Sequence, residues 1–214
     1  MNIMNNIEKN KFFEELMSRN YKPLDKVLPN TAVGIAGCGG LGSNIAHMLT
    51  RSGIGKLIIA DFDTVVMSNL NRQFFFVDDL GKNKVDALEK KLKKINPYIL
   101  IEKHKIKITP HNLFEIFQDT SIIVEAFDQV SQKNMILNSF LEKDRKNSYL
   151  VSASGMGGLD SSNLIKTKKF GNNVYLCGDF SNDSSLGLMA SRVNIAAAHE
   201  ANIVLRIIAE KFTP

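Results

Sequence analysis

A glycine-rich turn followed by an acidic residue is the part of this sequence whose residue types point most directly to chemistry. The hexapeptide that begins at Gly37 also contains Gly39, Gly40 and Gly42, and Asp61 closes the next apolar run. Glycines at these positions let a strand turn sharply and let the backbone approach a phosphate or ribose closely. Asp61 supplies a carboxylate that can accept hydrogen bonds from ribose hydroxyls. The sequence therefore predicts a nucleotide site, with a merely tight turn as the alternative.

Strand-like and helix-like runs alternate along the chain and predict the elements that position this turn. We expect strands at about 31–37, 56–61, 99–103, 122–127 and 150–153, and helices at about 7–19, 41–52, 84–95, 131–142 and 189–211. Two short strands within 161–176 predict an antiparallel addition. The expected fold is α/β and Rossmann-like, a mostly parallel twisted sheet with helices on both faces and a small antiparallel C-terminal extension. Gly37, Asp61 and Asp128 fall at the carboxyl ends of strands, where such sheets bind ligands.

Length and composition are those of an ordinary globular protein. The 214 residues, 44% hydrophobic and 23% charged, predict an N-terminal helical segment over 1–30 and a single nucleotide-binding domain over 31–214. No apolar run reaches the roughly twenty residues of a membrane-spanning helix, and the start of the sequence lacks the order of a signal peptide. Cys38 and Cys177 are too few for a disulfide framework, which favours a reducing, cytoplasmic location.

The positive charge of the chain raises the question of an anionic partner. The net charge is +5, but most of the excess lies in Lys-rich helical stretches such as 82–94, typical of a solvated surface. Lys166, Lys168 and Lys169 form a cluster without interleaved aromatic residues, so we expect no nucleic-acid partner. The polar segment 178–187 is predicted to be a mobile loop.

Further motifs give the sequence a family resemblance. Asp61-Phe62-Asp63 is followed by Ser68-Asn69-Leu70-Asn71-Arg72-Gln73, by Gly81-Lys82-Asn83-Lys84 and by Glu125-Ala126-Phe127-Asp128. Together with the glycine-rich turn, these motifs resemble the ThiF/MoeB family, the bacterial relatives of ubiquitin-activating enzymes. The resemblance covers about residues 19–210. It is closest to the short ThiF-type sulfur-carrier adenylyltransferases, through Ser154-Gly155-Met156 and the stretch 162–167.

The resemblance implies ATP-dependent adenylation of a small ubiquitin-like sulfur carrier. The C-terminal glycine carboxylate of a ThiS-like carrier, ending in Gly-Gly, would attack the α-phosphate of ATP and release pyrophosphate, as in thiamine thiazole biosynthesis. By resemblance, Arg72 and Lys84 bind phosphates, Asn69 hydrogen-bonds phosphate or the attacking carboxylate, and Asp128 holds Mg²⁺. Asp61, Asp63 and the glycines complete the ATP site. These residue types suit the reaction, because it is catalysed mainly by positioning and by stabilising charge on phosphate oxygens.

Each of these roles has a structural alternative. Arg72 and Lys84 would otherwise be surface cations, and Asp128 would cap the helix that starts near Ser131. In the family, an arginine near the N-terminus reaches the ATP of the partner subunit, and Arg19 lies at a compatible distance before the first strand. Arg19 is therefore predicted to act in trans within a homodimer, with an ordinary surface arginine as the alternative.

The cysteines distinguish this chain from many relatives. Larger family members carry two Cys-x-x-Cys zinc pairs, and some have a cysteine in the crossover loop that joins covalently to the carrier. Neither pattern is present, so we expect no zinc. Cys177 would be either a covalent intermediate or, as we favour, a buried inert thiol. Sulfur would then come from a separate persulfide donor, such as a cysteine desulfurase.

Other functions are compatible with parts of the pattern. A sister enzyme would adenylate the molybdopterin carrier or a modified tRNA base. A NAD-dependent oxidoreductase would use the same glycines and Asp61, because they also satisfy the dinucleotide fingerprint. A degenerate scaffold would bind ATP or a carrier without turnover.

Overall fold

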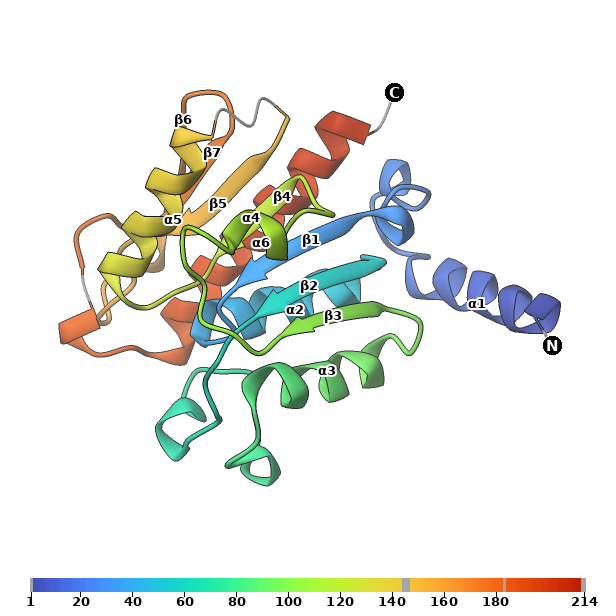
Figure 1. Cartoon of the computed structure of the whole chain (residues 1–214), viewed down its shortest axis with the longest axis horizontal. Helices are drawn as coiled ribbons and strands as arrows, with labels where there is room; N and C mark the ends of the chain where they lie inside the picture. The colour runs from blue at the N-terminus through green and yellow to red at the C-terminus, as the bar shows by residue number, and fades with distance from the viewer. Residues whose placement is uncertain (1, 144–146, 183, 213–214) are drawn as a thin grey trace.

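Seven short strands, most of them apolar, form one sheet in the computed structural model (Figure 1). The strand order is β3-β2-β1-β4-β5-β7-β6, and β6 alone of these described strands runs antiparallel to its neighbour. The strands are β1 (Ala32–Ala36), β2 (Lys56–Ala60), β3 (Leu100–His104), β4 (Ile122–Glu125), β5 (Tyr149–Ala153), β6 (Lys166–Phe170) and β7 (Val174–Gly178). The central strands are buried almost throughout, because helices cover both faces. The predicted Rossmann-like fold with an antiparallel extension is confirmed.

The helices divide between the two faces of the sheet. One face packs against α2 (Gly40–Ser52), α3 (Lys84–Ile95) and α6 (Ala190–Phe212), and the other against α4 (Leu113–Ile116) and α5 (Val130–Glu142). Helix α1 (Asn2–Leu16) projects from the amino ends of the strands (Figure 1). Single 3-10 turns lie at 22–24, 28–30, 67–69, 77–79, 162–164 and 184–186. Helix α6 packs against α2, β5 and β7, so its apolar circumference is explained by contacts under the sheet.

The structure describes residues 2–143, 147–182 and 184–212. Met1, Thr213 and Pro214, at the ends of the predicted segments, lie outside this part, as does Asp183 of the predicted loop. The division of the chain at residue 30 stays a prediction. None of the described helices has the length and hydropathy to cross a membrane.

The order of the strands creates the crevice in which a ligand can bind. The chain builds β1, β2 and β3 outward in one direction, then returns to place β4 beside β1 on the other side. Ala36 is level with Ala60 on one side and with Glu125 on the other, so these three strands end together. A reversal of strand order leaves a crevice at the carboxyl ends, which is where such sheets bind ligands.

Candidate functional site

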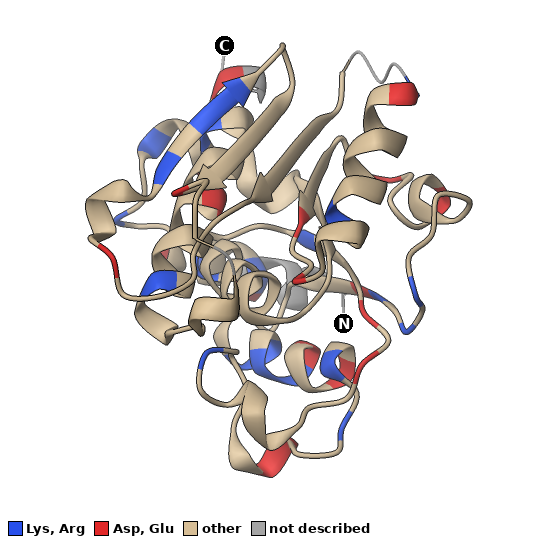
Figure 2. Ribbon diagram, turned by 90° about the vertical axis from the view of Figure 1, so that its left-hand side faces the viewer, with Lys and Arg blue, Asp and Glu red and all other residues tan. Residues whose placement is uncertain are grey.

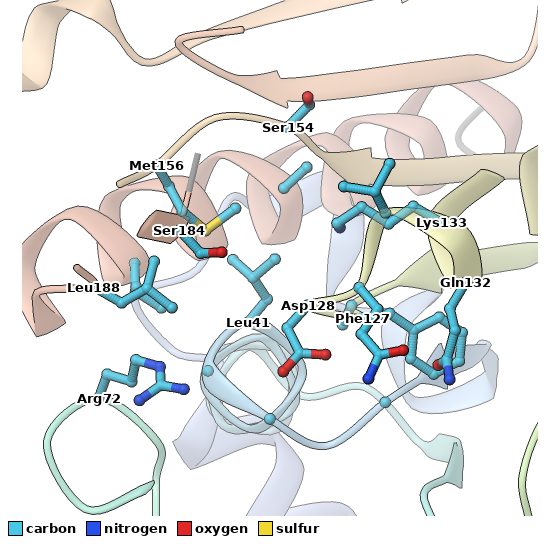
Figure 3. A pocket seen from close by; sticks show the side chains of 18 of the residues that line it. Leu41, Arg72, Phe127, Asp128, Gln132, Lys133, Ser154, Met156, Ser184 and Leu188 are labelled. Carbon is cyan, nitrogen blue, oxygen red and sulfur yellow. The ribbon is translucent and has the colours of Figure 1, made fainter. Parts of the chain in front are cut away.

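A cavity of about 330 Å³ lies at the carboxyl ends of the parallel strands. It is lined by residues that follow β1, β2, β4 and β5 and by the segment after β7 (Figure 3). The predicted residues on its wall are Gly37, Gly39, Gly40, Asp61, Asp63, Arg72, Lys84 and Asp128. Asn69, Gly42 and Arg19 are not on it. The volume suits a small-molecule ligand such as a nucleotide.

The glycine-rich turn forms one wall of the cavity and has steric reasons for its composition. Gly37 has a φ of 96°, and a Cβ there would stand 3.0 Å from the carbonyl oxygen of Ala126. Gly42 lies in α2, where a Cβ would collide with the carbonyl group of Gly37. Gly42 therefore lets α2 begin close to β1, while Gly39 and Gly40 leave backbone exposed to a ligand.

Asp61 fixes the shape of this turn. Its Oδ2 accepts a hydrogen bond from the backbone N–H of Cys38 at 2.7 Å, and its Oδ1 accepts one from the N–H of Asp63 at 2.7 Å. Burial raises the pKa of the Asp61 carboxyl, while the Lys84 ammonium and these N–H groups oppose the shift. The carboxylate joins the ends of β1 and β2, and it lines the cavity where the predicted ribose contact would be made.

The two predicted phosphate-binding cations reach the cavity from different elements. Lys84 begins α3, is buried, and donates from Nζ to Oδ2 of Asp63 at 2.7 Å. Arg72 donates from Nη1 to Oδ1 of Asn71 at 2.8 Å and to the carbonyl oxygen of Ser68 at 3.2 Å. Lys84 is therefore no surface cation, and Arg72 is held over the cavity by its own loop. Local contacts position both side chains before any phosphate arrives.

Asp128 follows β4 and lines the cavity. It is exposed, and among the described residues it makes no hydrogen bond or ion pair. Helix α5 begins at Val130, and its N-cap, Gln129, makes no side-chain capping bond. The alternative that Asp128 caps this helix is therefore wrong. Figure 3 shows its carboxylate and the Arg72 guanidinium pointing into the same space.

The remaining two predicted residues lie away from the cavity. The Oδ1 atom of Asn69 accepts a hydrogen bond from the N–H of Val66 at 3.1 Å. The Asn69 side chain therefore closes the turn that carries Arg72. Arg19 is exposed, and the adjacent Asn20 bonds the carbonyl oxygen of Ser52, at the far end of α2. Helix α2 has 13 residues, so about 20 Å separates that end from the glycine-rich turn. Arg19 does not reach the cavity of its own chain.

Sequence reasoning missed a buried ionic group behind Asp128. Glu125 is 1% exposed and accepts bonds from the N–H of Phe127, from Lys133 and from the hydroxyl of Ser152. Lys133 also lines the cavity. This group joins β4, β5 and α5 and fixes the turn that leads to Asp128. The available signal was the single carboxylate inside an otherwise apolar parallel strand.

Comparison with known proteins identifies the family. The ThiF family matches residues 14–201. The chain belongs to the ThiF family. Ubiquitin-like modifier-activating enzyme 5 of Drosophila melanogaster is 51% identical to it over 89 residues, which are 42% of this chain and 22% of the fly protein. The Dictyostelium discoideum protein of the same name is 47% identical over 89 residues, which are 42% of this chain and 23% of that protein. The chain thus matches less than a quarter of the length of these relatives.

Solved structures resemble this ThiF-family protein over more of its length. E. coli tRNA N6-threonylcarbamoyladenosine dehydratase, TcdA, in complex with AMP superposes with a TM-score of 0.81, covering 95% of each chain at 20% identity. This likeness concerns the fold. E. coli MccB with ATP superposes with a TM-score of 0.66 at 25% identity, covering 88% of this chain and 58% of MccB.

The segment after β7, described over residues 178–182 and 184–189, begins with contacts to α6 in this ThiF-family protein. Asp179 accepts backbone N–H bonds from Ser181 and Asn182, and it pairs with Arg192 of α6, whose side chain is 3% exposed. Burial opposes ionisation, but these hydrogen bonds lower the pKa of Asp179. A buried ion pair thus ties the start of the predicted loop to α6, while the mobility expected for 178–187 stays a prediction. Its Phe180 lines the cavity.

Both cysteines of the ThiF-family protein are buried. Burial raises the pKa of Cys177 to about 12, and the nearby Glu200 adds to the effect. Burial likewise raises the pKa of Cys38. A thiol without thiolate character is a poor nucleophile, so the geometry favours the inert role for Cys177.

Proposed function

We propose that this ThiF-family protein is an ATP-dependent adenylyltransferase that activates the C-terminal glycine of a small ubiquitin-like sulfur carrier. One observation carries the proposal: Arg72, Lys84 and Asp128, which has no partner among the described residues, surround one cavity beside the glycine-rich turn. The family match supports an adenylating enzyme, and the printed complexes of TcdA with AMP and MccB with ATP support an adenine nucleotide. A ThiS-like carrier, and hence thiamine thiazole biosynthesis, is our specific candidate.

The residues on the cavity wall divide the work of nucleotide binding. The exposed backbone of Gly39 and Gly40 lets phosphate or ribose approach closely. Asp61 would accept hydrogen bonds from the ribose hydroxyls. Arg72 and Lys84 offset the negative charge that grows on phosphate oxygens during transfer. Lys84 is held by Asp63, so little of its conformational freedom remains to be lost on binding.

The chemistry of the donor set fits Mg²⁺. Magnesium in nucleotide sites is commonly held by one or two carboxylates together with substrate phosphates. Asp128 offers a carboxylate with no described partner, facing the same space as Arg72. Without a cation, this carboxylate would repel a triphosphate. Asp128 would hold the ion, which would supply the positive charge that offsets this repulsion.

The site supports activation of the carboxylate but offers no nucleophile for sulfur transfer. Cys38 and Cys177 are buried with raised pKa values, so the reaction of this chain would end at the acyl-adenylate. A separate persulfide donor, such as a cysteine desulfurase, would then deliver sulfur. The alternatives are a molybdopterin-synthase-type carrier or a tRNA base as the adenylated group, and the test below separates them.

The test is exchange of labelled pyrophosphate into ATP in the presence of candidate carriers ending in Gly-Gly. We expect carrier-dependent exchange that falls by about 100-fold or more in Asp128→Ala and in Arg72→Ala, because each removes charge stabilisation at the phosphates. Arg206→Ala, an exposed change on α6, is the matched control and should leave exchange unchanged. Exchange driven by free carboxylic acids, AMP formation that requires tRNA, or reduction of a nicotinamide cofactor would contradict the proposal.

A further inference from the structure

The start of α2 buries two polar side chains among apolar ones. Ser43 is fully buried and Asn44 is 5% exposed. Their neighbours Leu41, Ile45 and Ala46 belong to the apolar core. Serine and asparagine are unfavourable inside a helix, because their side chains compete for backbone hydrogen bonds, and a buried polar group costs free energy unless it is hydrogen-bonded. The two residues therefore need a structural reason, and their hydrogen-bond partners supply one.

The Ser43 hydroxyl joins the glycine-rich turn to the loop that carries Arg72. Its Oγ atom donates a hydrogen bond to the carbonyl oxygen of Gly39 at 2.6 Å and accepts one from the backbone N–H of Phe74 at 2.9 Å. This N–H has no other partner in the described part of the chain. Without the hydroxyl it would have to find water or remain unpaired. The second bond of Ser43 thus serves the loop and not α2.

The Asn44 amide makes a corresponding connection two residues earlier in the loop. Its Nδ2 atom donates to the carbonyl oxygen of Gly40 at 2.6 Å and to that of Arg72 at 2.9 Å. The His47 ring, one turn further along α2, packs against the ring of Phe74 with the two centroids 4.6 Å apart. The start of α2 therefore holds the loop by two backbone groups and one aromatic ring.

This attachment sets how far Arg72 lies from the glycine-rich turn. A Cβ atom at Gly40 would stand 3.6 Å from Cγ and from Cδ of Arg72, so the aliphatic part of the arginine passes over the backbone of that glycine. Arg72 is the one charged residue in 64–77, whereas basic and acidic residues follow one another closely along α3 (Figure 2). No other cation of this loop can replace Arg72, so the position of residues 72–74 decides whether the charge reaches a phosphate.

We propose that Ser43 and Asn44 are positioning residues for Arg72: they hold the backbone of residues 72–74 against the start of α2 and thereby place the guanidinium at the phosphates of ATP. Neither side chain lines the cavity, so both act through Arg72 and not on the nucleotide. Where catalysis depends on positioning, a displacement of about 1 Å can lower the rate about 100-fold. This inference rests on the proposed function, because it assigns a role in the same reaction.

The two residues also have a simpler role, support of the glycine-rich turn, since both bond to carbonyl groups of that turn. Loss of that support would impair the site whether or not Arg72 is present. The positioning role predicts instead that the two side chains matter only while Arg72 is in place, because its removal leaves nothing to position. A double-mutant cycle separates the two roles, because it measures the coupling between two residues.

The test measures carrier-dependent pyrophosphate exchange at saturating ATP for Ser43→Ala and Asn44→Ala, each made in the wild-type chain and in Arg72→Ala. We expect each substitution to lower exchange about 10-fold or more in the first background and less than about twofold in the second. The matched controls are Ser52→Ala and Asn194→Ala, which should leave exchange unchanged. Ser52 and Asn194 form the same bond to a carbonyl oxygen one helical turn earlier, without a bond to the loop.

An equal loss in both backgrounds, or no loss in the wild-type chain, would overturn the positioning role. Ser43→Ala removes a single oxygen atom, so it decides the question if Asn44→Ala does not fold. If the wild-type protein shows no exchange with any carrier, the cycle is read from ATP dissociation constants measured by calorimetry with Mg²⁺. A coupling of about threefold or more would then support positioning and contradict the proposed function, whereas additive losses or no ATP binding would overturn the positioning role.

Discussion

At the scale of single residues, Glu200 couples protonation to folding. It is fully buried in α6, and neither of its carboxyl oxygens has a hydrogen-bond partner in the described structure. Burial raises its pKa well above the ordinary value, with Lys133 opposing the shift and Glu125 adding to it. The folded chain therefore holds a proton on Glu200 at pH values where the unfolded chain has released it. Stability attributable to this group must fall as pH rises from the unfolded pKa toward the folded one.

Glu200→Gln should remove this pH dependence, because the amide resembles the protonated acid and does not ionise. Near pH 4 the two proteins should unfold at similar urea concentrations. Above the unfolded pKa of about 4.3, the advantage of the variant should grow by up to about 1.4 kcal/mol per pH unit until the folded pKa is reached. Urea titrations between pH 4 and 8 measure this, with the exposed Glu14→Gln as the control. A variant advantage that does not change with pH would refute the argument.

At the scale of elements, regular periodicity could be predicted and tertiary ionic contacts could not. Helix α3 was predicted over 84–95 and is found at Lys84–Ile95, because an apolar stripe and a following Asn-Pro define it locally. Helix α4 has four residues, too few for a periodic pattern. The segment 178–187 was predicted to be mobile from its polar composition, which gives no sign that Asp179 pairs with Arg192, a residue outside the segment.

The candidate site, too, could be predicted from the sequence only in part. Asp128 could be placed from the end of a parallel strand, whereas Arg72 and Lys84 were assigned by the family resemblance, and all three line one cavity. Asn69 shows the limit of such reasoning. The Asn69 amide was expected to hydrogen-bond phosphate or the attacking carboxylate. The direction of this side chain depends on local turn geometry, and here it accepts a hydrogen bond from the N–H of Val66.

The Asp179–Arg192 pair should determine the order of the segment 178–189. Arg192→Met would leave the Asp179 carboxylate buried without its cation, and losing one partner of a buried pair costs about 3–5 kcal/mol. We expect faster hydrogen exchange in 178–182 and weaker ATP binding, since Phe180 to Asn182 line the cavity. Arg206→Met, whose ion pair on the same helix is exposed, should change neither. Unchanged exchange in the segment would show that other contacts order it.

At the scale of the whole molecule, the position of Arg19 means that any contact between Arg19 and ATP requires a second copy of the chain. Arg19 lies near the far end of α2, about 20 Å from the glycine-rich turn of its own chain. If it contacts ATP, only another subunit can supply it. The trans role of Arg19 therefore requires the predicted homodimer, whereas the homodimer itself does not require that role.

Subunit mixing tests this coupling. Arg19→Ala and Asp128→Ala should each have little exchange activity alone. In a mixed dimer, the Arg19→Ala subunit keeps Asp128 and receives Arg19 from its partner, so one of the two sites is intact. Random exchange makes about half of the dimers mixed, and about a quarter of wild-type activity should return. Full activity of Arg19→Ala alone would make it a surface arginine, and a mixture no more active than its components would contradict the trans arrangement, because a dimer with Arg19 acting across the interface must regain one site.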